Sequence, residues 1–186
     1  LTKYNIKTEV TATPRTGLAR FTFPEGDGNI LLNLGEGLTN ESGASVRFVS
    51  DTEIEGSKLM GTFCYNPQAV FPIYFVMKLD KAPKAKGYWK KQREMAAEAE
   101  WDSDAGKYKL YSKYTREMSG DDIGVWFKYD VEAKEQIQVK IGVSFVSIGN
   151  ARENLEKEQP GFAFDQTAEA AREAWNKDLS RVTVEG

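Results

Sequence analysis

The stretch EQIQVKIGVSFVSIG, residues 135–149, carries the strongest strand pattern in the chain. Apolar side chains occupy every second position, at Ile137, Val139, Ile141, Val143 and Phe145. Because successive side chains of a strand point to opposite faces of a sheet, this alternation predicts a long strand with one face in the core and the other wet or thinly covered. A helical pattern begins directly after Gly149, so we expect this strand and the helix behind it to organise the fold.

Size and composition describe a globular protein. The chain has 186 residues, of which 40% are hydrophobic and 28% are charged, which is enough to build a single core. The net charge of −3 gives no reason to expect a nucleic-acid partner. No apolar run approaches the ~18 residues that a membrane-spanning helix needs, so no membrane span is expected.

Two residue counts exclude several kinds of site. The chain has no histidine, which excludes Ser-His-Asp and Cys-His catalysis and every metal site that uses imidazole. Its single cysteine, Cys64, excludes an internal disulfide and is predicted to be a buried, inert thiol. Acidic residues are so numerous, at 28, that no carboxylate pair stands out as a glycosidase site. We therefore predict no catalytic residue, no metal ligand and no cofactor in this chain.

Shorter alternating or apolar runs predict further strands. They lie at residues 4–13, at a strand closed by Phe21 and Phe23, and at 30–34, 46–49, 53–63 and 70–79. The run 70–79 is the most apolar and is expected in the middle of a packed layer. Turn signals divide the later chain into strands at about 95–101, 107–117, 123–130 and 135–148, which we expect to pair in that order as a meander.

The C-terminal part of the chain changes from strand to helix periodicity. Asn150 is predicted to cap a first helix, with Glu153 at the capping-box position, and Pro160 ends the helical pattern. Many short strands followed by helices predict a mainly β protein. The expected fold is an antiparallel β-sandwich over residues 1–149, with two C-terminal helices in residues 150–186 that pack on it.

The second helix carries a narrow apolar stripe. Asp165 is predicted to cap this helix, and the stripe consists of residues at helical spacing: Ala168, Ala171, Trp175 and Leu179. Small residues allow a close approach of the backbone, and an indole is the largest apolar group on the helix. We therefore expect Trp175 and Leu179 to fix the position of the helix by packing on the sandwich.

One aromatic pair lies outside the predicted strands. Tyr88 and Trp89 follow Gly87 in a lysine-rich segment. Sugar rings stack their C–H faces on aromatic rings, so this pair is the one candidate for carbohydrate contact. The alternative, in which the two rings line a hairpin or cover a sheet edge, stays open.

Two longer blocks of sequence carry a family resemblance. The first is TATPRTGLARFTFP, residues 11–24. The second begins with VKIGVSFVS at residues 139–147 and continues through Ala151, Asn154, Leu155 and Glu158 to Trp175, Leu179 and the segment 182–184. Together they resemble glycoside hydrolase family 92, the calcium-dependent exo-α-mannosidases, and the resemblance covers nearly the whole chain.

This resemblance implies a part of a larger enzyme. In that family a supersandwich-like β-sandwich is joined by linker helices to a catalytic (α/α)6 barrel, and this chain resembles the later part of the sandwich with those helices. The catalytic residues and calcium ligands of the family lie chiefly in the barrel, so none is assigned here. Arg15 and Arg20 fit the family pattern and are interpreted as structural.

The resemblance also implies the setting of the parent protein. We expect a bacterial, periplasmic, cell-surface or secreted enzyme that cleaves α-1,2-mannosides with inversion and acts on mannose-containing glycans. The expected partner of this chain is the barrel of the same parent chain, with Trp175 and Leu179 as the interdomain anchor.

Function classes other than an enzyme domain remain open. The leading interpretation is a non-catalytic β-sandwich domain that helps shape the substrate cleft beside an absent barrel. The alternative is a stand-alone carbohydrate-binding or cell-surface adhesion module, which predicts glycan binding by this chain alone. A carrier with an interior apolar cavity would need a closed barrel, which the helical tail does not favour.

Overall fold

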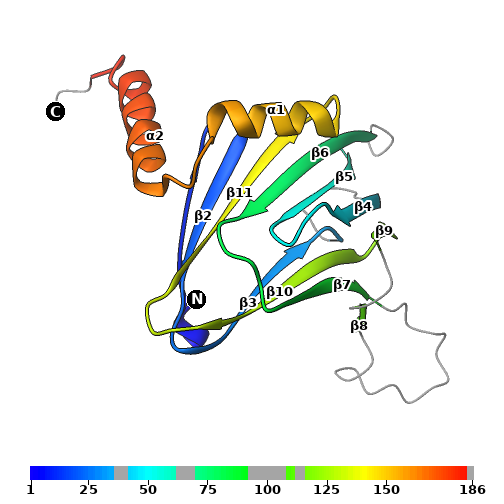
Figure 1. Ribbon diagram of the computed structural model, residues 1–186. Coiled ribbons are helices and arrows are strands. Elements are labelled where there is room, and N and C mark those ends of the chain that lie inside the picture. The colour runs from blue at the N-terminus through cyan, green and yellow to red at the C-terminus, as the bar shows by residue number, and fades with distance from the viewer. Residues whose placement is uncertain (36–41, 62–69, 92–107, 112–115, 184–186) are drawn as a thin grey trace.

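The computed structural model describes residues 1–35, 42–61, 70–91, 108–111 and 116–183. Two of the sequence predictions, the buried thiol of Cys64 and the strand at 95–101, lie outside these ranges. The described chain forms two antiparallel sheets and two helices (Figure 1). The predicted antiparallel β-sandwich with C-terminal helices is confirmed.

The two sheets differ in size. The larger one has seven strands in the order β1 (Lys7–Ala12), β2 (Thr16–Thr22), β11 (Gln136–Ser144), β6 (Val70–Leu79), β5 (Glu53–Gly61), β4 (Ser42–Phe48) and β9 (Glu117–Gly120). The smaller one has four, in the order β3 (Gly26–Asn33), β10 (Ile123–Val131), β7 (Ala85–Lys91) and β8 (Tyr108–Tyr111). The most apolar stretch of the sequence, β6, is the middle strand of the seven, as predicted.

Strand β11, which lies within the alternating stretch 135–149, is inside the larger sheet. It pairs with β2 on one side and with β6 on the other. Its odd-numbered residues face the smaller sheet, and Ile137 is fully buried there. The strand ends at Ser144, so the prediction that Phe145 continues the core face is wrong: the side chain of Phe145 is 67% exposed.

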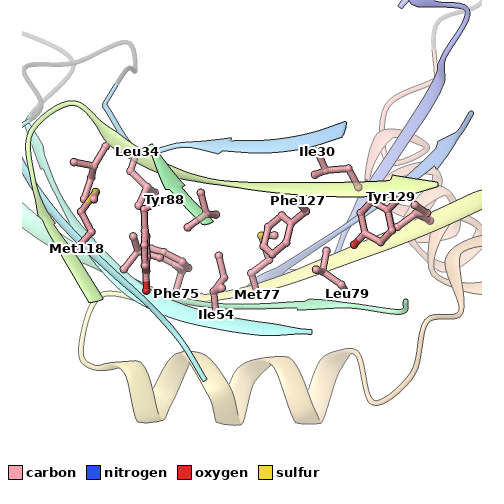
Figure 2. Packing of buried hydrophobic residues seen from close by; sticks show 14 of the residues in the cluster. Ile30, Leu34, Ile54, Phe75, Met77, Leu79, Tyr88, Met118, Phe127 and Tyr129 are labelled. Carbon is pink, nitrogen blue, oxygen red and sulfur yellow. The ribbon is translucent and has the colours of Figure 1, made fainter. Parts of the chain in front are cut away.

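The core fills the space between the two sheets. Figure 2 shows side chains from both layers meeting there, among them Ile54, Phe75 and Met77 from the larger sheet and Tyr88 and Phe127 from the smaller one. Strand β10 contributes every second residue to this core, from Ile123 to Val131, which matches the period of two for a strand that packs on one face.

The predicted meander of the later strands is wrong. Strand β9 pairs with β4 in the larger sheet, whereas β10 pairs with β3 and β7 in the smaller one. The chain then returns to the larger sheet as β11. Turn signals predicted the bounds of β10 to within one residue, but they missed β9, which was expected to lie in a strand at 107–117 and a turn after it. Such signals also carry no information about which layer each strand joins, because that choice depends on contacts far apart in the sequence.

The two helices follow β11. Helix α1 spans Ile148–Glu158, and its N-cap is Ser147, whose hydroxyl accepts a hydrogen bond from the backbone N–H of Asn150 at 3.0 Å. Helix α2 spans Phe164–Leu179 with Ala163 at its N-cap. The predictions that Asn150 and Asp165 cap these helices are therefore wrong by three and two positions. Such shifts are common because the boundary residues compete for the same backbone donors.

Helix α1 covers the outer face of the larger sheet. Ala151 and Leu155 are buried against Val76 of β6. Gly142 of β11 permits this contact, since a Cβ at that position would lie 2.5 Å from the carbonyl oxygen of Ala151. The outer face of β11 is consequently buried under a helix. The sequence predicted that this face would be exposed to solvent or only thinly covered. Helix α2, in contrast, projects away from the sheets (Figure 1).

Candidate functional site

In the region where the β-sandwich gives way to the helices, several side-chain contacts join the two parts of the chain. At the centre of this region, Glu158 at the end of α1 meets the turn between β1 and β2. Its Oε1 accepts a hydrogen bond from Nε of Arg15 at 2.5 Å, and its Oε2 accepts one from the backbone N–H of Arg15 at 3.0 Å and another from the hydroxyl of Thr13. Burial alone would raise the pKa of Glu158, but these donors outweigh it and lower the pKa.

Arg20 makes the second tie between the sheet and the helices. Its guanidinium donates to Glu9 of β1 at 3.0 and 3.1 Å and to Asp165 of α2 at 3.0 Å, and it lies 4.3 Å from the ring centroid of Phe164. The hydrogen bond from Arg20 is the main reason that the pKa of Glu9 falls to about 2. Both arginines cross from the sandwich to a helix, Arg15 at Glu158 and Arg20 at Asp165, which agrees with the interpretation of them as structural.

Lys140 makes the third tie, from the outer face of β11. Its side chain is only 5% exposed, and its Nζ donates to the carbonyl oxygens of Gln159 at 2.6 Å and of Gly161 at 3.3 Å. The sequence analysis missed this residue, since a lysine between two apolar neighbours in an alternating strand indicates a solvated face. Only the position of α1 over the sheet shows that this face is covered.

A groove with mostly apolar walls lies between α2 and the sandwich. Its volume is about 700 Å³. The end of β1 contributes Ala12, the turn after it contributes Pro14, and α2 contributes Ala170, Ala174 and Trp175. Small side chains on both walls leave this space open. The groove is thus bounded by the β1–β2 end of the sandwich and by the helices, which Arg20 and Glu158 hold together.

The prediction that the stripe of α2 packs on the sandwich is wrong for its large residues. Trp175 is 69% exposed and Leu179 is 65% exposed. Only the start of the helix is buried, at Phe164, whose ring lies beneath Arg20. The physical reason is the direction of the helix: α2 leaves the sheet after its first turns, so residues farther along have no sheet surface to contact.

Tyr88 and Trp89 lie in strand β7 and not in a loop. Tyr88 is 2% exposed, and its hydroxyl donates to the carbonyl oxygen of Arg116 at 2.7 Å and accepts from the backbone N–H of Phe48 at 3.2 Å. Trp89 is 6% exposed and lies across Gly124 of β10. Burial on this scale leaves no ring face open to a sugar, so the predicted carbohydrate contact conflicts with the structure.

Carboxylates beneath α1 are engaged in structural pairs. Arg152 of α1 reaches Glu53 and Glu55 of β5, and Glu55 also receives Arg47. Burial would raise the pKa of Glu55, but the hydrogen bonds from Arg47 and Arg152 outweigh it and lower the pKa. A general acid needs a raised pKa, so Glu55 does not fit that role. Within the described residues, no group of three acidic or thiol side chains is arranged to hold a metal ion.

Comparison with known proteins places these elements in a family. The sequence model of the Glycosyl hydrolase family 92 N-terminal domain matches residues 1–144, and that of the Glycosyl hydrolase family 92 catalytic domain matches residues 150–186. The chain belongs to glycosyl hydrolase family 92. The groove and the three ties described above thus lie at the junction between the N-terminal-domain match and the start of the catalytic-domain match.

Solved structures share the fold of this chain. A family GH92 α-mannosidase from Bacteroides thetaiotaomicron superposes with a TM-score of 0.78 at 24% identity, over 100% of this chain and 23% of that one. The inverting GH92 mannosidase from Bacteroides thetaiotaomicron VPI-5482 superposes with a TM-score of 0.72 at 23% identity, over 97% of this chain and 22% of that one. This chain therefore spans less than a quarter of either relative's length. No curated protein sequence matches it.

Over the residues that the structure describes, neither α1 nor α2 has the length and apolar character needed to cross a bilayer.

Proposed function

We propose that this chain is the non-catalytic N-terminal β-sandwich of a family 92 α-mannosidase, together with the first helices of its catalytic domain. The observation that carries the proposal is the exposed apolar stripe of α2 and the segment behind it. Trp175, Leu179 and Val182 are 69%, 65% and 76% exposed. Trp175 and Leu179 are four residues apart on α2, which puts them on one side of the helix, and Val182 follows in the segment behind it. These residues lie within the match to the catalytic domain.

The partner proposed for this stripe is the remainder of the catalytic domain in the same parent chain. The polypeptide enters that domain through α2, so the following segment begins beside the stripe. The groove beside Ala170 and Ala174 offers further apolar surface continuous with Trp175. A contiguous exposed apolar surface of this kind is typical of an interface that is completed by another domain.

The activity belongs, in this proposal, to the parent protein and not to this chain. The carboxylates of Glu9, Glu55 and Glu158, whose pKa values are lowered, are bound to arginine, which does not suit them to act as general acids. We propose that the parent hydrolyses α-1,2-mannosides of glycans outside the cytoplasm, with calcium held by its catalytic domain, and that the sandwich forms one wall of the substrate cleft. The buried positions of Tyr88 and Trp89 give no support to a stand-alone sugar-binding module.

Hydrolysis of an aryl α-mannoside tests the proposal. Two proteins are compared: this chain, and the longer parent protein that the proposal requires, both with calcium present. We expect turnover by the longer protein only. Turnover by this chain, or none by the longer protein with any α-mannoside, contradicts the proposal.

A variant pair connects the stripe with activity. In the longer protein, Trp175→Ala is expected to lower activity by about tenfold or more, since truncation of a buried interface aromatic commonly costs over 1.4 kcal/mol. Glu173→Ala, an exposed position on the same helix, is the matched control and is expected to retain activity. Equal activities of the two variants would show that the catalytic domain does not rest on Trp175.

A further inference from the structure

The direction of α2 is set over a short length of chain. The segment 159–163, here called the elbow, joins α1 to α2. Beyond its first turns α2 is exposed, so the sheet does not support most of its length. Whatever fixes the angle of α2 relative to the sandwich therefore acts in or next to the elbow.

Lys140 contacts the elbow in its middle. The Nζ of Lys140 donates to the carbonyl oxygens of Gln159, at 2.6 Å, and Gly161, at 3.3 Å, and lies 4.6 Å from the ring centroid of Phe162. Carbonyls that follow the end of a helix lack partners within it and carry partial negative charge. A buried ammonium group thus satisfies acceptors that the turn from α1 to α2 leaves free.

The environment of Lys140 is unusual for a lysine. In the described chain no ion pair joins it to a carboxylate, whereas its neighbour across the ladder, Lys78, pairs with Glu53 at 3.3 Å. Burial of an ammonium group costs free energy unless fixed polar groups surround it. Here those groups are main-chain carbonyls whose positions define the path of the elbow, so the cost is offset only while the elbow keeps this path.

We propose that Lys140 is a positioning residue that fixes the elbow and thereby sets the direction of α2 before any partner domain binds. Two other side-chain contacts next to Lys140 support this assignment. Gln159 and Thr167 exchange hydrogen bonds across the elbow at 3.1 and 3.2 Å, and Arg20 holds Asp165. Neither of these contacts reaches the carbonyl oxygens of Gln159 and Gly161, to which Lys140 donates. The hydroxyl of Thr167 also donates to the carbonyl oxygen of Ala163 at 3.0 Å, but only at the last residue of the elbow. The inference concerns this chain by itself and does not depend on the proposed function.

Two spin labels measure the direction of α2 directly. They are placed at exposed positions through Lys157→Cys on α1 and Glu173→Cys on α2, in a Cys64→Ser background. Lys140→Met keeps the length and apolar stem of the side chain but removes its charge and donors. We expect Lys140→Met to broaden the distance distribution between the labels, while Lys78→Met, in the next strand of the same face, leaves the distribution narrow.

Hydrogen exchange separates positioning from general stability. In Lys140→Met the amides of residues 161–167 should exchange about tenfold faster or more, because hydrogen bonds from a charged donor typically contribute at least that factor. The amides of β11 and of the first turns of α1 should be unchanged. Phe162→Leu, a milder change at the same contact, should have a smaller effect of the same kind.

Two results would overturn the inference. One is an unchanged distance distribution with unchanged exchange in Lys140→Met, which would show that the other ties are sufficient. The other is faster exchange of β11, α1 and the elbow by the same factor, which would show that Lys140 only stabilises the fold. If Lys140→Met does not fold, an unchanged distribution in Phe162→Leu counts against the inference in the same way.

Discussion

Glu158 and Arg15 form a two-point contact between the end of α1 and the turn that joins β1 to β2. The backbone N–H of Arg15 donates to Oε2 at 3.0 Å and its side-chain Nε donates to Oε1 at 2.5 Å. The side chain of Glu158 is only 14% exposed, so water competes little for these bonds. This contact fixes the end of α1 beside the turn between β1 and β2, where the groove between α2 and the sandwich begins.

Loss of this contact should destabilise the chain. We expect Glu158→Ala to lower the free energy of unfolding by about 1–3 kcal/mol, because it leaves a backbone N–H, a hydroxyl and a guanidinium without their acceptor. Urea unfolding followed by circular dichroism measures the change. Glu173→Ala on the exposed side of α2 is the control and should stay within about 0.5 kcal/mol of the parent sequence.

The free energy of unfolding should decrease in acid, because carboxylates with lowered pKa values are protonated there. The pKa of Glu9 is about 2 in the folded chain against 4.5 for a free side chain, and the pKa values of Glu55 and Glu158 are also lowered. As the pH falls below about 4.5, these carboxylates are protonated in the unfolded chain before they are protonated in the folded chain. Their contribution to the free energy of unfolding is therefore complete above about pH 4.5 and is lost towards pH 2. Urea titrations across this range should show the decline, and Glu158→Gln should make it shallower. A flat profile would count against these assignments.

The close approach of α1 to β11 depends on Gly142. In Gly142→Ala the new Cβ would meet the Cβ of Leu155 at 2.7 Å and the carbonyl oxygen of Ala151 at 2.5 Å, so the helix has to move outward. We expect a loss of about 1–3 kcal/mol in the free energy of unfolding. Gly149→Ala is the matched control: its nearest atom is 3.6 Å away, and alanine favours a helix. Equal stabilities of the two variants would show that α1 does not pack this closely.

Trp175 should contribute little to the stability of this chain. Its side chain is 69% exposed, so Trp175→Ala is expected to change the free energy of unfolding by less than about 0.5 kcal/mol. Leu155→Ala, a truncation at a residue that is 1% exposed, should cost about 2–5 kcal/mol by comparison. A loss of several kcal/mol on truncation of Trp175 would mean that α2 folds back onto the sandwich in solution.

The sequence predicted the layers of this protein better than their connections. Alternation identified β11, and apolar content identified β6 as the middle strand, because burial on one or both faces leaves a local trace. The assignment of β9 and β10 to different sheets has no such trace, so the meander was predicted in error. Strand β7 was missed because its lysines dilute the apolar pattern around Tyr88.

The junction between sandwich and helices was predictable only in part. Arg15 and Arg20 could be interpreted as structural from their place in the family pattern, and the structure supplies their partners, Glu158 and Asp165. Lys140 gave no signal, because the burial of a strand face depends on what packs over it. Trp175 was expected to be buried because it is a large apolar residue on a helix, but its burial needs a surface that this chain does not provide.

Solvent labelling of Trp175 tests the central claim, that the exposed stripe of α2 receives the remainder of the catalytic domain. The rate of hydroxyl-radical modification at Trp175 and Leu179 is measured in this chain and in the longer parent protein that the proposed function requires, with Leu31, 66% exposed on β3, as the internal reference. We predict that both stripe residues react about tenfold or more slowly in the longer protein, as expected for side chains removed from water in an interface core. Equal rates in the two proteins, relative to Leu31, would contradict that claim.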